Sequence, residues 1–102
     1  MIIHLVFFSV KGQPDLEQAK QDIIDSLKDV PGPLKPMQFS APVSDMRTKG
    51  FNFGFIAYFK NREALRAYDI SDAHQSAVQN VIKSRIEDFL DYDIDVPDGA
   101  PV

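Results

Sequence analysis

The sequence of 102 residues contains no cysteine, no tryptophan and only 2 histidines. Because cysteine is absent, the chain cannot be a disulfide scaffold, hold a thiolate zinc site or use a cysteine nucleophile. Two histidines provide few ligands for a catalytic zinc ion or a haem group, and nothing else in the sequence supports either. We therefore expect no cofactor and no metal.

The sequence also lacks a long apolar run and an excess of positive charge. The apolar stretch at residues 2–8 is too short to cross a bilayer, and it has neither the basic flank nor the small-residue cleavage site of a signal peptide. With 11 basic and 15 acidic side chains, the formal charge of −4 argues against nucleic acid as a partner. We expect one cytoplasmic domain over residues 1–96, independent of membranes, followed by a flexible tail at residues 97–102.

Apolar periodicity and capping residues predict the secondary structure. A nearly continuous apolar run predicts an opening strand buried on both faces, and alternating apolar residues predict three later strands. Asn61 and Ser71 are typical helix-capping residues, and Ile86 and Phe89 fit inward positions of the helix that Ser71 begins. The predicted strands are residues 2–9, 37–43, 51–59 and 92–96, and the predicted helices are residues 14–30, 61–68 and 71–89.

This order of elements matches the βαββαβ unit of ferredoxin-like folds. In this α+β sandwich, two helices cover one face of a four-stranded antiparallel sheet. One layer of helices can cover only one sheet face, and a second apolar face left in water would be larger than soluble monomers usually expose. We therefore expect a homodimer that pairs through the sheet face. The aromatic side chains expected on that second face are Phe51, Phe53, Phe55 and Phe59.

Three stretches, taken in order, resemble the stress-responsive dimeric α/β-barrel family. They are the opening strand with His4, the Val-Pro-Gly exit of the first helix, and a run that joins Tyr68 and His74 to the last strand. The resemblance covers residues 1–96. It implies that two ferredoxin-like sheets pair face to face to form a dimeric α/β barrel.

The same resemblance implies candidate roles for individual residues. Most members of the family have no assigned reaction, but one plant member is a polyketide cyclase. Likeness to that cyclase implies catalytic roles for His74 and Tyr68 and a place in the pocket for His4. This chain departs from the cyclase at Phe53 and Ile23, where polar pocket residues are replaced, and both changes argue against the cyclase substrate.

Tyr68 and His74 are also a plausible pair on geometric grounds. On one unbroken helix their spacing would turn them to different faces, whereas a break near Ser71 would let both face one cavity. His74 would then lie in the first helical turn, where the helix dipole disfavours imidazolium and leaves a neutral general base. Tyr68 would orient an oxygen of the substrate. Alternatively, His74 is structural or contacts a ligand without catalysis, and Tyr68 packs beside it.

His4, Phe53 and Phe55 are the candidate ligand-binding residues. Strand alternation gives His4 a defined face among apolar neighbours, where it is either a core residue or a polar anchor in the cavity of His74. Phe53 and Phe55 would shape an apolar pocket, although core packing is the simpler interpretation. Three carboxylates share one face of the last strand, where we expect them to be solvated and a surface divalent ion is the alternative: Asp91, Asp93 and Asp95.

Two functions remain open on these observations. The favoured one is a non-catalytic protein that binds a small hydrophobic molecule or acts in assembly. The alternative is a cofactor-free, polyketide-cyclase-like enzyme in which His74 is the general base and Tyr68 orients a hydrophobic carbonyl substrate. A haem-free monooxygenase of the same dimeric architecture is a third hypothesis. An open pocket of at least a few hundred Å³ that touches both Tyr68 and His74 would favour binding or catalysis, and an interior filled by side chains would favour a structural role.

Overall fold

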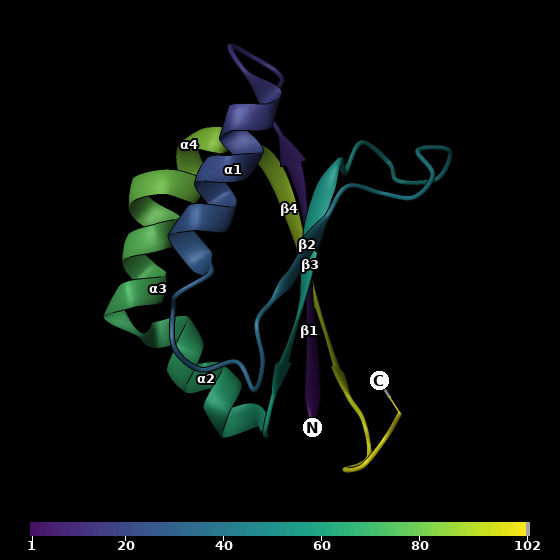
Figure 1. Cartoon of the computed structure of the whole chain (residues 1–102), viewed down its shortest axis with the longest axis vertical. Coiled ribbons are helices and arrows are strands. Elements are labelled where there is room, and N and C mark those ends of the chain that lie inside the picture. Colours follow the sequence, from purple (N-terminus) through teal and green to yellow (C-terminus); the bar gives the residue numbers. More distant parts are fainter. Residues whose placement is uncertain (102) are drawn as a thin grey trace.

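The computed structural model describes residues 1–101 and has a four-stranded antiparallel sheet in the order β2-β3-β1-β4 (Figure 1). All the helices lie on one side of this sheet, so the predicted ferredoxin-like α+β fold is confirmed. The strands are β1 (Ile2–Val10), β2 (Gln38–Ser40), β3 (Phe53–Phe59) and β4 (Ile86–Asp95). The helices are α1 (Leu16–Leu27), α2 (Arg62–Ile70), α3 (Asp72–Ala77) and α4 (Lys83–Arg85), with the π-helical turn η1 (Val78–Ile82) between α3 and α4.

The strand register decides which side chains face the helices. Residues directly opposite each other in an antiparallel pair point to the same face. His4 pairs with Ala57 on β3 and with Asp93 on β4, and all three therefore lie on the helix face. The core beneath the helices is built from alternate residues of the central strands and from the inward side of the helices: Ile2, Val6, Phe8, Val10, Ile23, Leu27, Phe53, Phe55, Ala57, Phe59, Leu65, Tyr68, Ala77 and Ile82.

The expected exposure of the phenylalanine-rich face is wrong. Phe53, Phe55 and Phe59 are buried under the helices, and Phe51 lies in the connection before β3. Both faces of the central strands are apolar. The alternation of residues therefore shows which side chains share a face, but it does not indicate which face the helices cover. The uncovered face, which we call the open face, carries the other set of residues: Ile3, Leu5, Phe7, Ile56, Leu90, Tyr92 and Ile94.

The boundaries of several elements also differ from prediction. The last helix ends at Arg85, and β4 begins at Ile86 rather than at residue 92, so Phe89 belongs to the sheet and is exposed. Ile86 and Phe89 fit helical spacing, which is why the sequence predicts a helix there. In the structure they form hydrogen-bonded strand pairs with β1, so they belong to the sheet. The predicted second strand shortens to three residues, and the third strand begins two residues later than predicted.

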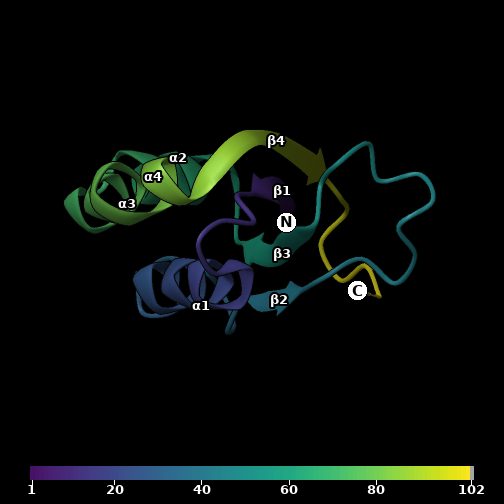
Figure 2. The same cartoon turned by 90° about the horizontal axis from the view of Figure 1, so that it is seen from above.

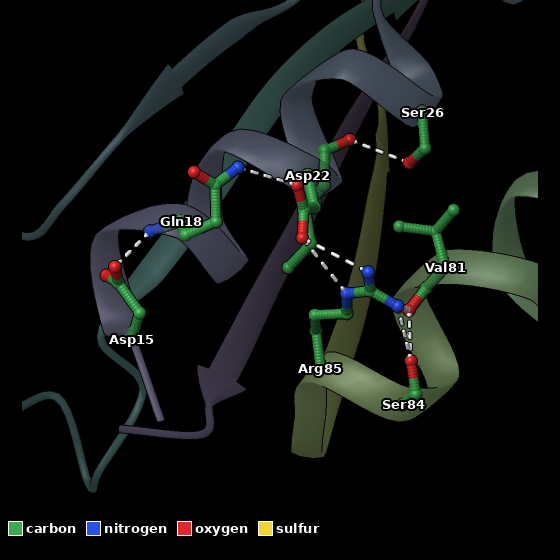
Figure 3. Close-up of polar contacts among 8 residues, drawn as sticks. Asp15, Gln18, Asp22, Ser26, Val81, Ser84 and Arg85 are labelled. Carbon is green, nitrogen blue, oxygen red and sulfur yellow. Dashed lines mark hydrogen bonds and ion pairs between the residues drawn. The ribbon is translucent and has the colours of Figure 1, made fainter. Parts of the chain in front are cut away.

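An ion pair joins the two helical segments that border the site described below. The Arg85 guanidinium on α4 donates to the Asp22 carboxylate on α1 from Nε at 3.2 Å and from a terminal nitrogen at 3.1 Å (Figure 3). The pKa of Asp22 lies below its ordinary value because Gln18 and Arg85 hydrogen-bond to its carboxylate. The contact fixes the end of the helical layer at the point where the chain turns into β4.

The open face is bordered by two loops. The long connection between β2 and β3 and the segment after β4 both project to the side of the sheet away from the helices (Figure 2). A groove of about 620 Å³ lies between this connection and an apolar floor that includes Leu5, Phe7 and Leu90. Tyr92 keeps 56% of its surface exposed and Leu90 keeps 44%. The open face is therefore a continuous apolar surface on the isolated chain.

The segment after β4 includes most of the predicted tail. The N-terminal ammonium donates to the carbonyl oxygen of Val96 and pairs with the Asp98 carboxylate at 2.9 Å. Val102, the last residue of the predicted tail, lies outside the described residues. No helix within residues 1–101 has the length and apolar character needed to cross a membrane.

Candidate functional site

A pocket of about 660 Å³ lies between the helical layer and the β1–β4 half of the sheet. Its volume falls in the range of sites that bind small organic molecules. The polar residues His4, Asp69, His74 and Asp91 contribute to its lining. The apolar part of the wall consists of Val6, Phe8, Leu27, Phe55, Val78, Ile82, Ile86 and Phe89. Further polar side chains line the pocket along the last helical turns and the start of β4: Gln75, Gln79, Lys83, Glu87 and Asp88.

The predicted helix break at Ser71 is confirmed and positions His74. Ser71 has extended backbone angles, and its hydroxyl accepts the backbone N–H of His74 at 3.2 Å while donating to the carbonyl oxygen of Tyr68 at 2.8 Å. His74 therefore lies in the first turn of a new helix, α3, which begins at Asp72. The η1 turn then contributes Val78 and Ile82 to the pocket, and such widened turns are frequent at functional sites.

The hydrogen bond of the His74 ring defines its tautomer. Nδ1 lies 3.0 Å from the backbone carbonyl oxygen of Asp69. Because a carbonyl oxygen can only accept, Nδ1 carries the proton. In the neutral ring Nε2 then holds the lone pair, which is the arrangement that a general base or a hydrogen-bond acceptor requires.

Tyr68 lies beside both histidines but does not line the pocket. Its ring centroid is 4.6 Å from that of His74 and 6.3 Å from that of His4. The hydroxyl is directed at the Met37 sulfur, 4.0 Å away, and the side chain is almost fully buried. Burial, followed by the nearby charges of Asp69 and Asp91, raises the pKa of Tyr68 well above its ordinary value. The rings of Tyr68 and His74 are therefore in contact, but the expectation that both face one cavity is wrong, because His74 lines the pocket and the Tyr68 phenol is turned to the core.

His4 is the most buried polar side chain of the site, with 2% of its surface exposed, and it lines the same pocket as His74. Its ring packs edge-on against Phe55 and Phe59. Its Nδ1 makes a short hydrogen bond to the Asp93 carboxylate and lies 3.3 Å from the Asp91 carboxylate. A carboxylate behind an imidazole fixes the ring orientation and tautomer, as in hydrolase triads.

Two carboxyl groups near the histidines, those of Asp69 and Asp91, have raised pKa values. Removal from water raises the pKa of Asp91 to about 6, with His4 opposing the shift and Asp93 adding to it. Burial also raises the pKa of Asp69, against the opposing effect of His4 and His74. Perturbed carboxyl groups that line a pocket are typical of functional sites.

The remaining predicted residues separate into two groups. Phe55 lines the pocket, whereas Phe53, on the same face of β3, stacks on Phe39 of β2 and belongs to the core. The three carboxylates of the last strand are exposed, as predicted, but Asp91 and Asp93 also contact His4, which the sequence pattern did not predict. Asp95 pairs instead with Arg62.

One cluster has the spacing needed to share a cation. Among residues 1–101, the ligand atoms of His4, Asp91 and Asp93 are the ones that lie within 4.8 Å of one another. The imidazole atom in this group is Nδ1, which already donates to a carboxylate. A cation would have to replace that proton, so the arrangement resembles a hydrogen-bonded dyad more than a metal site.

Sequence reasoning missed Asp69, Asp91 and Asp93 as members of the site. Asp69 follows Tyr68 directly, but only the helix break brings its carbonyl group to His74. The two β4 carboxylates reach His4 because β4 pairs with β1. In the case of Asp93, the two residues are 89 positions apart in the sequence. The available signal was the alternation of charged and apolar residues at 90–94. A strand that is solvated on both sides does not need apolar residues on one face, so this alternation indicates that the strand packs against the rest of the protein.

Comparison with known proteins agrees with this architecture. The chain is similar to a Dabb-family protein of ferredoxin-like fold from Mesorhizobium loti, with 25% identity over 96% of this chain and 97% of that one and a TM-score of 0.77. A dimeric ferredoxin-like protein of unknown function from Jannaschia sp. is 22% identical over 93% of this chain and 98% of that chain, with a TM-score of 0.72.

A third similar structure is an enzyme. It is a hydroxynitrile lyase from Passiflora edulis, 17% identical over 98% of this chain and 96% of that one, with a TM-score of 0.77. No curated protein matches the sequence. The family model described as "Stress responsive A/B Barrel Domain" matches residues 2–96, which confirms the resemblance drawn from the sequence. The chain belongs to the stress-responsive A/B barrel domain family.

Proposed function

We propose that the protein is a homodimer in which each protomer binds a small hydrophobic molecule with one polar end. The observation that carries this proposal is the pocket of about 660 Å³, with apolar walls and two histidines at its polar end. A purely structural protein would have an interior filled by its own side chains. The described residues instead leave this pocket open. A ligand would place its apolar body between the helices and β1 and its polar group beside His4 and His74.

The binding proposal is tested with a matched pair of probes. 4-Butylbenzyl alcohol has an apolar body and one hydroxyl group, and butylbenzene lacks the hydroxyl. We expect the alcohol to bind more tightly in a calorimetric or NMR titration, because only it can use the acceptors of the polar end. Val78→Phe, which fills the pocket, is expected to abolish binding, and Ala73→Phe, on an exposed site of the same helix, is expected to retain it. Equal binding by both variants would contradict this site.

The open face supports self-association. Its partly exposed apolar side chains would each contribute about 1 kcal/mol if a second sheet covered them. The Jannaschia neighbour is described as dimeric. Sedimentation at micromolar concentration is expected to give twice the 11.5 kDa chain mass. Tyr92→Lys should yield the monomer, whereas Ile70→Lys, at an exposed apolar site on the helix layer, should leave the dimer intact.

A second candidate function is cofactor-free general-base catalysis. It is favoured by the His74 tautomer, because Nδ1–H donates to a backbone carbonyl and leaves the Nε2 lone pair free in the neutral ring. In this role His74 would remove a proton next to a carbonyl or from a hydroxyl group. The phenol of Tyr68 contacts Met37, so we assign Tyr68 the role of holding the His74 ring by packing.

The Passiflora edulis neighbour provides a concrete assay, since it is a hydroxynitrile lyase. Removal of the hydroxyl proton of mandelonitrile lets the carbon–carbon bond to cyanide break, giving benzaldehyde and cyanide. We expect benzaldehyde release that His74→Ala abolishes and that Ala73→Ser, at an exposed site of α3 outside the pocket, retains. If wild-type protein gave only the uncatalysed rate while still binding the alcohol probe, this second candidate would fail and the binding proposal would stand.

A further inference from the structure

The polar end of the pocket is built from hydrogen-bond acceptors. His74 uses its Nδ1 proton on the Asp69 carbonyl, which leaves Nε2 as an acceptor in the neutral ring. His4 uses its Nδ1 proton on the β4 carboxylates. Asp69 and Asp91 bring carboxylates to the lining. The donors of the lining are Gln75, Gln79 and Lys83. A ligand head that lies between His4, His74 and Asp91 meets acceptors and would therefore donate hydrogen bonds.

The same end of the pocket also carries unbalanced negative charge. The Asp91 and Asp93 carboxylates both approach one His4 nitrogen, so even a protonated His4 ring would balance only one of them. The cationic side chain among the described lining residues is Lys83, on α4. Partial burial and the neighbouring Asp93 carboxylate raise the pKa of Asp91 to about 6, and His4 only partly opposes this shift. Asp91 is nevertheless mainly ionised at neutral pH.

We propose that Asp91 makes the pocket selective for hydrophobic amines and alcohols and excludes hydrophobic carboxylates of the same shape. This inference rests on the proposed binding function and names the class of ligand for that site. An ammonium head would supply both the donors and the positive charge that the polar end lacks. A neutral hydroxyl would supply a donor only, and a carboxylate would meet like charge at short range.

Three probes with the same body measure this selectivity: 4-butylbenzylamine, 4-butylbenzyl alcohol and 4-butylbenzoate. At pH 7.5 we expect affinity to fall in that order, with the amine at least about 30-fold tighter than the benzoate. Asp91→Asn keeps the shape of the side chain and removes its charge. In this variant we expect the ratio of amine to benzoate affinity to fall to about 5-fold or less, with part of the change coming from tighter benzoate binding.

Asp95→Asn is the matched control, because it removes the same charge from the same face of β4 without touching the pocket. It should retain the wild-type ratio. Equal affinities of all three probes for the wild-type protein would overturn the selectivity while leaving the pocket in place. An unchanged ratio in Asp91→Asn would overturn the role of Asp91. If none of the probes bound, the binding function would fail and this inference with it.

Discussion

Replacement of Asp91 by asparagine should stabilise the protein at neutral pH. The pKa of Asp91 is raised by burial to about 6 from an ordinary value of 3.8. A raised pKa means that the folded state binds this proton more tightly than the unfolded state does. Ionisation of Asp91 therefore costs stability, and the cost develops as the pH rises from about 4 to about 6 and persists above it. An asparagine side chain at this position does not ionise and would carry no such cost.

The size of this effect is set by how far Asp91 is exposed. A shift of that size in a fully desolvated carboxyl group would correspond to about 3 kcal/mol. The Asp91 side chain is 41% exposed, and water screens the charge, so we expect about 1 kcal/mol. His4 keeps its hydrogen bond to Asp93 in the variant, so the imidazole does not lose its partner.

Urea unfolding at fixed protein concentration, followed by circular dichroism between pH 4.5 and pH 8, measures this effect. The variant should unfold with a higher free energy at pH 7.5, and the two proteins should converge at pH 4.5. Asp95→Asn, on the same strand but outside the pocket, controls for the loss of a surface charge. Destabilisation of Asp91→Asn that grows with pH would show that attraction to His4 outweighs desolvation, and it would refute this reasoning.

Three further substitutions test the architecture around the site. Gly54→Ala should lower the free energy of unfolding in urea by about 1–3 kcal/mol, because a Cβ atom there would lie 2.8 Å from the Val6 carbonyl oxygen. Ser71→Ala should cost about 1 kcal/mol through loss of the helix cap, and the NMR signals of the His74 ring should shift because its helical turn is released. Tyr68→Phe should cost about 1 kcal/mol or less and leave the affinity for 4-butylbenzyl alcohol unchanged, since the hydroxyl faces a thioether sulfur outside the pocket.

The parts of the structure that could be predicted rest on local chemistry. Ser71 ends one helix and caps the next through its own hydroxyl, so the sequence alone indicated the helix break that brings Tyr68 next to His74. The alternation of side chains along β1 likewise predicted which residues of the strand share a sheet face with His4. Both inferences depend on contacts between residues a few positions apart, or on the two-residue repeat of a single strand.

The parts that could not be predicted depend on contacts between distant segments. Ile86 and Phe89 fit helical spacing as well as strand spacing, and pairing with β1 decides between the two. The contact of His4 with Asp91 and Asp93 requires the register of β4 against β1, which no local pattern specifies. The covered face of β3 was also unpredictable, because both of its faces are apolar and only the placement of the helices distinguishes them.

The register of β4 connects the pocket with the proposed dimer interface. Its alternate residues send Asp91 and Asp93 to the helix face and Leu90 and Tyr92 to the open face. A slip of one residue against β1 would exchange the two sets, placing apolar side chains beside His4 and carboxylates on the open face. The hydrogen bond between His4 and Asp93 opposes such a slip from one face of the strand, and burial of the apolar set in a dimer would oppose it from the other. Dimerisation would therefore help to hold the acidic end of the pocket in place, although the two surfaces share no side chain.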